Sequence, residues 1–103
     1  EVDSVGHWQR TMQGHAAANL MPVIAANRIG TETVEPCPEN GNQKSALRFY
    51  GSSFITDGTG AIAVSMDRDS EGVIASEFDL DELMEERLSW GLFRDRRPEV
   101  YHE

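Results

Sequence analysis

The chain has 103 residues, which is enough for one small domain. Hydrophobic residues make up 39% and charged residues 26%, slightly apolar-poor for a domain standing alone, so part of its core is expected to be completed elsewhere. The chain has eighteen acidic residues and nine Lys and Arg, which gives a formal net charge of −9. This balance excludes a nucleic-acid groove, which needs a basic face. It suits solubility or a cationic small molecule.

Several features of the sequence bear on the cellular compartment of the protein. Cys37 is the only cysteine, so no internal disulfide is possible and nothing indicates secretion. No apolar run approaches the roughly 18 residues of a membrane span, and no signal peptide is present. We therefore expect a cytoplasmic protein without a membrane partner. The chain begins at Glu1 without Met, which fits a fragment or a processed product.

The first third of the chain predicts a helix followed by a strand. Residues 3–20 carry apolar side chains at helical spacing, and Asp3 or Ser4 can cap the N-terminus. Gly14 and the three alanines after His15 give one helix face little bulk, so another element can approach closely. Pro22 ends the helix, and residues 23–26 predict a short strand buried on both faces.

The middle of the chain predicts a loop and an antiparallel pair of strands. Residues 30–46 are polar and rich in Pro and Gly, which favours a long surface loop. Residues 47–56 and 61–66 predict two strands joined by the tight turn 57–60. A second turn at residues 69–72 leads to a predicted strand at 73–78.

The last third predicts a capped helix and a tail. Asp79 is the predicted N-cap residue, and Glu82, three residues later, occupies the N3 position of a capping box. The apolar stripe of this helix comprises Leu80, Leu83, Met84 and Leu88, and the helix is expected to end near Trp90-Gly91. Residues 91–103 lack periodicity but hold Phe93, Tyr101 and the arginines 94, 96 and 97, so the tail is expected to dock on another surface. Strands flanked by helices indicate layered α/β packing.

Few residues suggest chemistry. Cys37 lies between two prolines without a neighbouring cation, so a structural thiol is favoured over a nucleophile. His7 and His15 are too far apart for a metal pair, and a packed or polar role is favoured. His102 is expected to be solvated. Residues 58–60 predict a turn, because a strand follows them where a phosphate loop would have a helix.

Two further groups of residues leave alternatives open. The arginines 94–97 could bind an anion, although pairing with carboxylates of this acidic chain is favoured. Asn27-Arg28 ends a predicted buried strand, where open α/β sheets place site residues, and a structural hydrogen-bonding role is equally plausible.

Three blocks of sequence, in order, resemble the carbon–nitrogen hydrolases of the nitrilase superfamily. They are HWQRTMQGHAAANLMPVIAANRIG (7–30), FYGSSFITDGTGAI (49–62) and VIASEFDLDELMEERLSWGLFRDRRPEVY (73–101). In the second block Gly58 stands where the family commonly has Pro. The last block, with QGHA and ANRIG, is most similar to the N-carbamoylputrescine amidase branch.

The resemblance implies the C-terminal portion of a four-layer α-β-β-α sandwich. It implies hydrolysis of N-carbamoylputrescine to putrescine, carbon dioxide and ammonia, a step of polyamine biosynthesis. The family uses a Glu base, a Lys and a nucleophilic Cys, with no metal or organic cofactor. These three residues lie N-terminal to the part that matches residue 7 onward. No catalytic, substrate-binding, cofactor-binding or metal-binding residue is therefore assigned to this chain, and the 103 residues alone are expected to be inactive.

The resemblance divides the chain into the C-terminal portion of the hydrolase domain, residues 1–90, and a tail, residues 91–103, docked at a protomer interface. The helix at residues 7–20 and the tail are candidates for the contact of a homo-oligomer, or both pack on their own protomer. Half a sandwich would expose strand faces and edges. The alternatives are a non-catalytic assembly module and a part of another nitrilase branch, such as a β-ureidopropionase.

Overall fold

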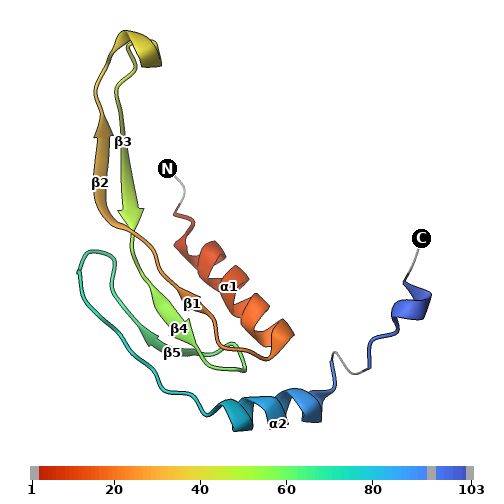
Figure 1. Ribbon diagram of the computed structural model, residues 1–103. Coiled ribbons are helices and arrows are strands. Elements are labelled where there is room, and N and C mark those ends of the chain that lie inside the picture. The colour runs from red at the N-terminus through yellow and green to blue at the C-terminus, as the bar shows by residue number, and fades with distance from the viewer. Residues whose placement is uncertain (1–2, 93–94, 102–103) are drawn as a thin grey trace.

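The computed structural model describes residues 3–92 and 95–101. Its body consists of helix α1 (Val5–Asn19) and a three-stranded sheet of β1 (Ile24–Ala25), β4 (Phe54–Thr56) and β5 (Ile62–Ser65). A two-stranded arm, β2 (Ile29–Val34) and β3 (Ser45–Tyr50), projects from the body and carries the short 3-10 helix η1 (Pro38–Asn40) at its end. After β5 the chain runs to helix α2 (Leu80–Trp90) and the 3-10 helix η2 (Pro98–Val100) (Figure 1).

The core lies between α1 and one face of the sheet. The strand order is β1-β4-β5, with both pairs antiparallel. Phe54 is fully buried, and Trp8 of α1 meets its ring edge-on at 5.3 Å between centroids. The small side chain of Ala16 is also fully buried. Helix and strands therefore form two packed layers, in agreement with the predicted α/β class.

Helix α1 confirms the helix predicted at residues 3–20. Of the two proposed capping residues, Asp3 makes the bond: its Oδ1 accepts from the backbone N–H of Val5 at 3.2 Å, whereas Ser4 makes no side-chain cap bond. Leu20 ends the helix in the left-handed conformation, with φ of 51°. Its backbone N–H caps carbonyls of the last turn, as in other helix C-termini.

The turn between β4 and β5 confirms the prediction for residues 57–60. Oδ1 of Asp57 accepts from the backbone N–H of Thr59 at 2.8 Å, from its hydroxyl at 2.6 Å and from the backbone N–H of Ala61 at 3.2 Å. Gly60 has φ of 92°, which favours glycine. The turn lies against α1, because Nε2 of Gln13 donates to the carbonyl of Gly60 at 3.0 Å.

The predicted loop at residues 30–46 is wrong, because most of it belongs to the arm. Strands β2 and β3 pair antiparallel from Ile29 opposite Tyr50 to Val34 opposite Ser45. Both faces of such a ribbon are largely in solvent, so its sequence need not alternate between apolar and polar residues.

The single strand predicted at residues 47–56 is also wrong, since Gly51 and Ser52 divide it into β3 and β4. Their φ values are 53° and 60°, incompatible with a continuous strand. A side chain at position 51 would come within 2.7 Å of Cγ2 of Ile29 and 2.8 Å of the carbonyl oxygen of Arg68. Glycine therefore permits the close approach of three segments at this point.

Two strand predictions fail. Residues 73–78 follow the predicted second turn but form none of the described strands, and Val73 is 94% exposed. The predicted strand at 23–26 shrinks to β1, and Ile24 is 74% exposed rather than buried. Both side chains lie where no second layer covers them.

Helix α2 confirms the predicted cap and the predicted end. Oδ1 of Asp79 accepts from the backbone N–H of Asp81 at 2.9 Å and of Glu82 at 3.2 Å, and Gly91 ends the helix with φ of 65°. The apolar stripe is largely uncovered: Leu80, Met84 and Leu88 are exposed and only Leu83 is half-buried. The described part of the tail runs away from the body (Figure 1). Of its predicted anchors, Tyr101 is 69% exposed and Phe93 lies outside the described residues.

The whole molecule is open. Its radius of gyration is 19.3 Å, whereas a compact chain of this length has about 13 Å. Its accessible surface is 7933 Å², against about 5,800 Å² for a compact monomer of this mass. The excess, about 2,100 Å², is larger than the roughly 800 Å² that one partner contributes to a standard protein–protein interface.

Candidate functional site

One candidate site is a groove of about 460 Å³ on the side of the sheet away from α1. The pairing registers place Ile24 opposite Ile55 and Ile55 opposite Val64, so these three share one sheet face, and Phe54 points to the other, toward α1. Ile24 and Ile55 form one wall of the groove. The opposite wall comes from the segment after β5, with Met66, Val73 and Ile74.

Asn27 and Ser53 at one end of the groove bond to the backbone. The backbone N–H of Asn27 donates to Oγ of Ser53 at 2.8 Å, and Nδ2 of Asn27 donates to the carbonyl of Gly51 at 3.1 Å. Oδ1 of Asn27 accepts from the backbone N–H of Arg28 at 2.8 Å. The Asn27 side chain thus ties β1 to the break between β3 and β4, which is the structural role left open by the sequence.

Arg28 turns away from the groove and along the arm. Its Nη1 lies 3.2 Å from Oε2 of Glu32, and its guanidinium carbon is 4.3 Å from the centroid of the Phe49 ring. The guanidinium is therefore engaged by an exposed ion pair and a cation–π contact on the arm.

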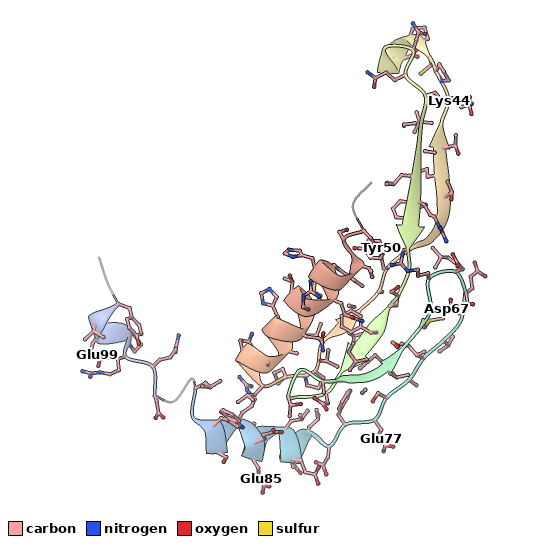
Figure 2. All side chains as sticks on the ribbon, turned by 180° about the vertical axis from the view of Figure 1, so that it is seen from behind. Lys44, Tyr50, Asp67, Glu77, Glu85 and Glu99 are labelled. Carbon is pink, nitrogen blue, oxygen red and sulfur yellow. The ribbon has the colours of Figure 1, made fainter. Side chains whose placement is uncertain are left out.

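Asp67 lies at the groove's rim, near the base of the arm (Figure 2). Its Oδ1 accepts from the backbone N–H groups of Asp69 at 2.9 Å and Ser70 at 2.7 Å, and its Oδ2 accepts from the Ser70 hydroxyl at 2.8 Å. The bond from Asp69, followed by those from Ser70, lowers the pKa of the Asp67 carboxyl. Asp67 is therefore ionised at neutral pH and shapes the predicted second turn.

A smaller hollow of about 240 Å³ lies between the turn after β4 and α2. Its lining includes five carboxylates: Asp57, Glu77, Asp79, Glu82 and Glu86. Asp57 and Asp79 bond to backbone N–H groups of the turn and of the helix start. Among the described residues, no group of three or more His, Cys, Asp or Glu side chains is arranged to hold a metal ion.

The only cysteine and the only lysine, Cys37 and Lys44, lie near the far end of the arm (Figures 1 and 2). Glu39 lies beside Cys37: its own backbone N–H, and then the Cys37 thiol, lower the pKa of the Glu39 carboxyl by hydrogen bonding. A carboxylate neighbour is the reverse of the electropositive setting that activates a thiol. None of these three residues lines either hollow.

The remaining candidates do not gather into a site. His7 and His15 are both exposed on α1, and His102 and Arg94 lie outside the described residues. Arg97 pairs with Glu99 at 3.0 Å, as predicted for the arginine cluster. The groove was not predicted from the sequence, because its walls come from segments predicted to pair or to be buried. Along the part of the chain that the structure describes, no helix is long and apolar enough to cross a membrane.

Comparison with known proteins decides the family. Residues 4–87 match the family model described as carbon-nitrogen hydrolase. The chain belongs to the carbon–nitrogen hydrolase family. The resemblance seen in the sequence is thereby confirmed.

Individual relatives extend this result. Over 100 residues the chain is 51% identical to the N-carbamoylputrescine amidase of Arabidopsis thaliana, covering 97% of this chain and 32% of that protein. It is 50% identical to the citrullinase of Francisella tularensis over 103 residues, covering all of this chain and 33% of that one. The chain thus spans about a third of the length of the curated relatives it matches.

A solved structure matches the fold. The crystal structure of a carbon-nitrogen hydrolase from Helicobacter pylori G27 superposes with a TM-score of 0.74 at 33% identity, covering 93% of this chain and 31% of that chain. The open arrangement of helix, sheet and arm therefore corresponds to part of a chain about three times as long.

Proposed function

We propose that these 103 residues are part of a hydrolase that converts N-carbamoylputrescine and water into putrescine, carbon dioxide and ammonia, a step of polyamine biosynthesis. The observation that carries the proposal is the 51% identity to an N-carbamoylputrescine amidase over 97% of the chain. The excess of exposed surface supports the view that more of the domain exists beyond these residues.

The chemistry is supplied by residues outside this chain. The resemblance implies a Glu base, a Lys that stabilises the tetrahedral intermediate and a Cys that carries the acyl group. Cleavage of a ureido C–N bond needs such an activated nucleophile beside a positive charge. The arm positions Cys37 and Lys44 away from the groove, so neither is assigned this role.

In this proposal the described residues contribute structure. The sheet and α1 form two layers of a four-layer α-β-β-α sandwich, and the groove side of the sheet faces the next layer. Residues 1–90 belong to that domain. The tail, residues 91–103, and the exposed side of α1 contact a second protomer in a homo-oligomeric cytoplasmic enzyme.

A citrullinase is the second candidate, favoured by the 50% identity over the full chain. Citrulline and N-carbamoylputrescine share the terminal ureido group, and citrulline carries an additional α-carboxylate. The two activities therefore cleave the same kind of ureido C–N bond. They differ in whether the site must bind the negative charge of an α-carboxylate.

The test measures ammonia release by the longer protein that carries this chain, with its intact mass determined on the same sample. We expect release from N-carbamoylputrescine and none from the isolated 103 residues, whose mass is 11.5 kDa. Faster release from citrulline would replace the proposed substrate by the second candidate. Release only from N-carbamoyl-β-alanine would indicate a β-ureidopropionase. Activity of the 103 residues alone would refute the placement of the catalytic residues.

A further inference from the structure

The outer edge of strand β2 in the arm has backbone groups that no described strand pairs with. The backbone N–H of Gly51 donates to the carbonyl of Arg28 at 2.8 Å, which fixes the hydrogen-bonding phase of the antiparallel arm. In that phase every second residue of β2 bonds to β3, and the residues between them face outward. The backbone groups of Ile29, Thr31 and Thr33 therefore point to the outer edge, which none of the described strands occupies.

The two outer edges of the arm differ in charge. On β3 the outward-facing residues include Arg48, whose Nη2 lies 3.0 Å from Oδ1 of Asp69. A charged side chain on an edge strand discourages pairing with a further strand. On β2 the outward-facing residues are uncharged, and Ile, Thr and Val make up four of the six residues of the strand, which favours β structure. The edge of β2 is therefore the better template for pairing.

The distribution of charge identifies a second copy of the chain as the partner. Residues 28–50 contain three acidic and three basic side chains, so the net charge of −9 lies entirely in the rest of the chain. Like charge opposes the approach of two copies through their bodies and does not oppose their approach through the arms. The acidic helix α2 also lies at the opposite end of the molecule from the tip of the arm (Figure 1).

We infer that the arm is a self-association surface, in which the outer edge of β2 pairs antiparallel with β2 of a second copy. The result is a four-stranded sheet in the order β3-β2-β2-β3 about a two-fold axis. The inference goes beyond the proposed function, because this contact lies on a different surface from the tail and α1. It also does not depend on which reaction the longer protein catalyses.

Charge selects the register of this pairing. If the two-fold axis passes beside Thr31, each Thr31 lies opposite Thr31 of the other copy and Glu32 lies opposite Gly30. If the axis passes beside Glu32 instead, two carboxylates lie directly opposite each other, which destabilises a strand pair. The expected register is therefore the one centred on Thr31.

Disulfide cross-linking tests this register in the longer protein that carries the chain. Cys37 is first replaced by Ser, and Thr31→Cys is then introduced and oxidised. Directly opposite, hydrogen-bonded residues have Cα atoms about 5.5 Å apart, which is within the range of a disulfide. Trypsin then releases residues 29–44 as one peptide, because Arg28 and Lys44 are the flanking basic residues. Two such peptides joined by a disulfide come from two different copies.

Thr33→Cys in the same background is the matched control. In the expected register Thr33 lies opposite Ile29 of the other copy, so the two Thr33 positions are about 13 Å apart along the strand. We expect at least about tenfold more linked peptide from Thr31→Cys than from Thr33→Cys. Equal or larger amounts from Thr33→Cys, or none from Thr31→Cys, would overturn the inference.

A pair of proline substitutions tests whether the edge of β2 carries association. Thr31→Pro removes an outward-facing N–H of β2, and Ala46→Pro removes one of β3, so neither takes a bond from the β2–β3 pair. Thr31→Pro is expected to halve the mass of the oligomer in sedimentation velocity, and Ala46→Pro is expected to leave that mass unchanged. Equal effects would show that proline acts by distorting the arm, and the inference would then be wrong.

Neither measurement uses ammonia release, so the arm contact and the proposed function are tested separately. Absence of release from N-carbamoylputrescine would refute the proposed reaction and leave the cross-linking result intact. Release without the Thr31 cross-link would refute only the arm contact. If Thr31→Pro does not fold, the comparison of Thr31→Cys with Thr33→Cys decides alone.

Discussion

Gly60 is the residue at which the turn after β4 meets helix α1. A Cβ atom there would lie 2.8 Å from the carbonyl oxygen of Gln13 and 3.0 Å from Cβ of Ala17, and the φ of 92° strains any L side chain. Gly60→Ala is therefore expected to lower the free energy of unfolding by roughly 1–3 kcal/mol, measured by urea denaturation. Gly14→Ala is the control, because a Cβ atom at position 14 would meet nothing within 4 Å. This substitution should stabilise the helix interior by about 0.5–1 kcal/mol. Equal losses would refute the close contact at Gly60.

Asp57 makes the same turn sensitive to acid. The hydroxyl of Thr59, and then the backbone N–H groups of the turn, lower the pKa of the Asp57 carboxyl below its ordinary 3.8 and outweigh partial desolvation. Since the folded pKa is depressed, the stabilisation is present above pH 3.8 and is lost as the pH falls through the folded value. Urea denaturation between about pH 6 and pH 2 should show the advantage of the native chain over Asp57→Asn shrinking below pH 3.8. Parallel curves for the two proteins would contradict this account.

The start of helix α2 depends on one capping side chain. Asp79→Ala removes the acceptor for the backbone N–H groups of Asp81 and Glu82, and should cost about 0.5–2 kcal/mol of helix stability. The N-cap of α1 supplies the control, because Ser4 makes no side-chain cap bond and Ser4→Ala should change little. Amide exchange of each helix is the measurement. Similar changes at both helices would show that Asp79 does not act as a cap.

Elements with local signals could be predicted from the sequence, and elements that depend on a partner could not. Asp79, Gly91 and the 57–60 turn each carry their structural reason within a few residues, and all three predictions are confirmed. The arm has no such signal, because a ribbon exposed on both faces tolerates polar residues throughout. The signal for dividing residues 47–56 was available: a glycine inside a strand pattern marks a break, and Gly51 provides it.

The candidate site shows the same division. The prediction that the tail arginines pair with carboxylates is confirmed at Arg97, whose Nε lies 3.0 Å from Oε1 of Glu99. The groove could not be predicted, since it forms between β1 and a segment, residues 66–74, that is distant in sequence. The groove is open because no other layer of the described structure covers the apolar side chains of Ile24 and Val73.

At the scale of the whole molecule, the isolated chain should behave as an open structure. An extended chain of this mass exposes about 16,700 Å², so unfolding would newly expose about 8,700 Å², against about 10,900 Å² for a compact monomer. The denaturant slope scales with this area, so we expect about four-fifths of the slope of a compact domain of equal size. Small-angle X-ray scattering of the monomer should give a radius of gyration near 19.3 Å. A value near 13 Å with a full slope would mean that the chain closes its own groove and is compact in isolation.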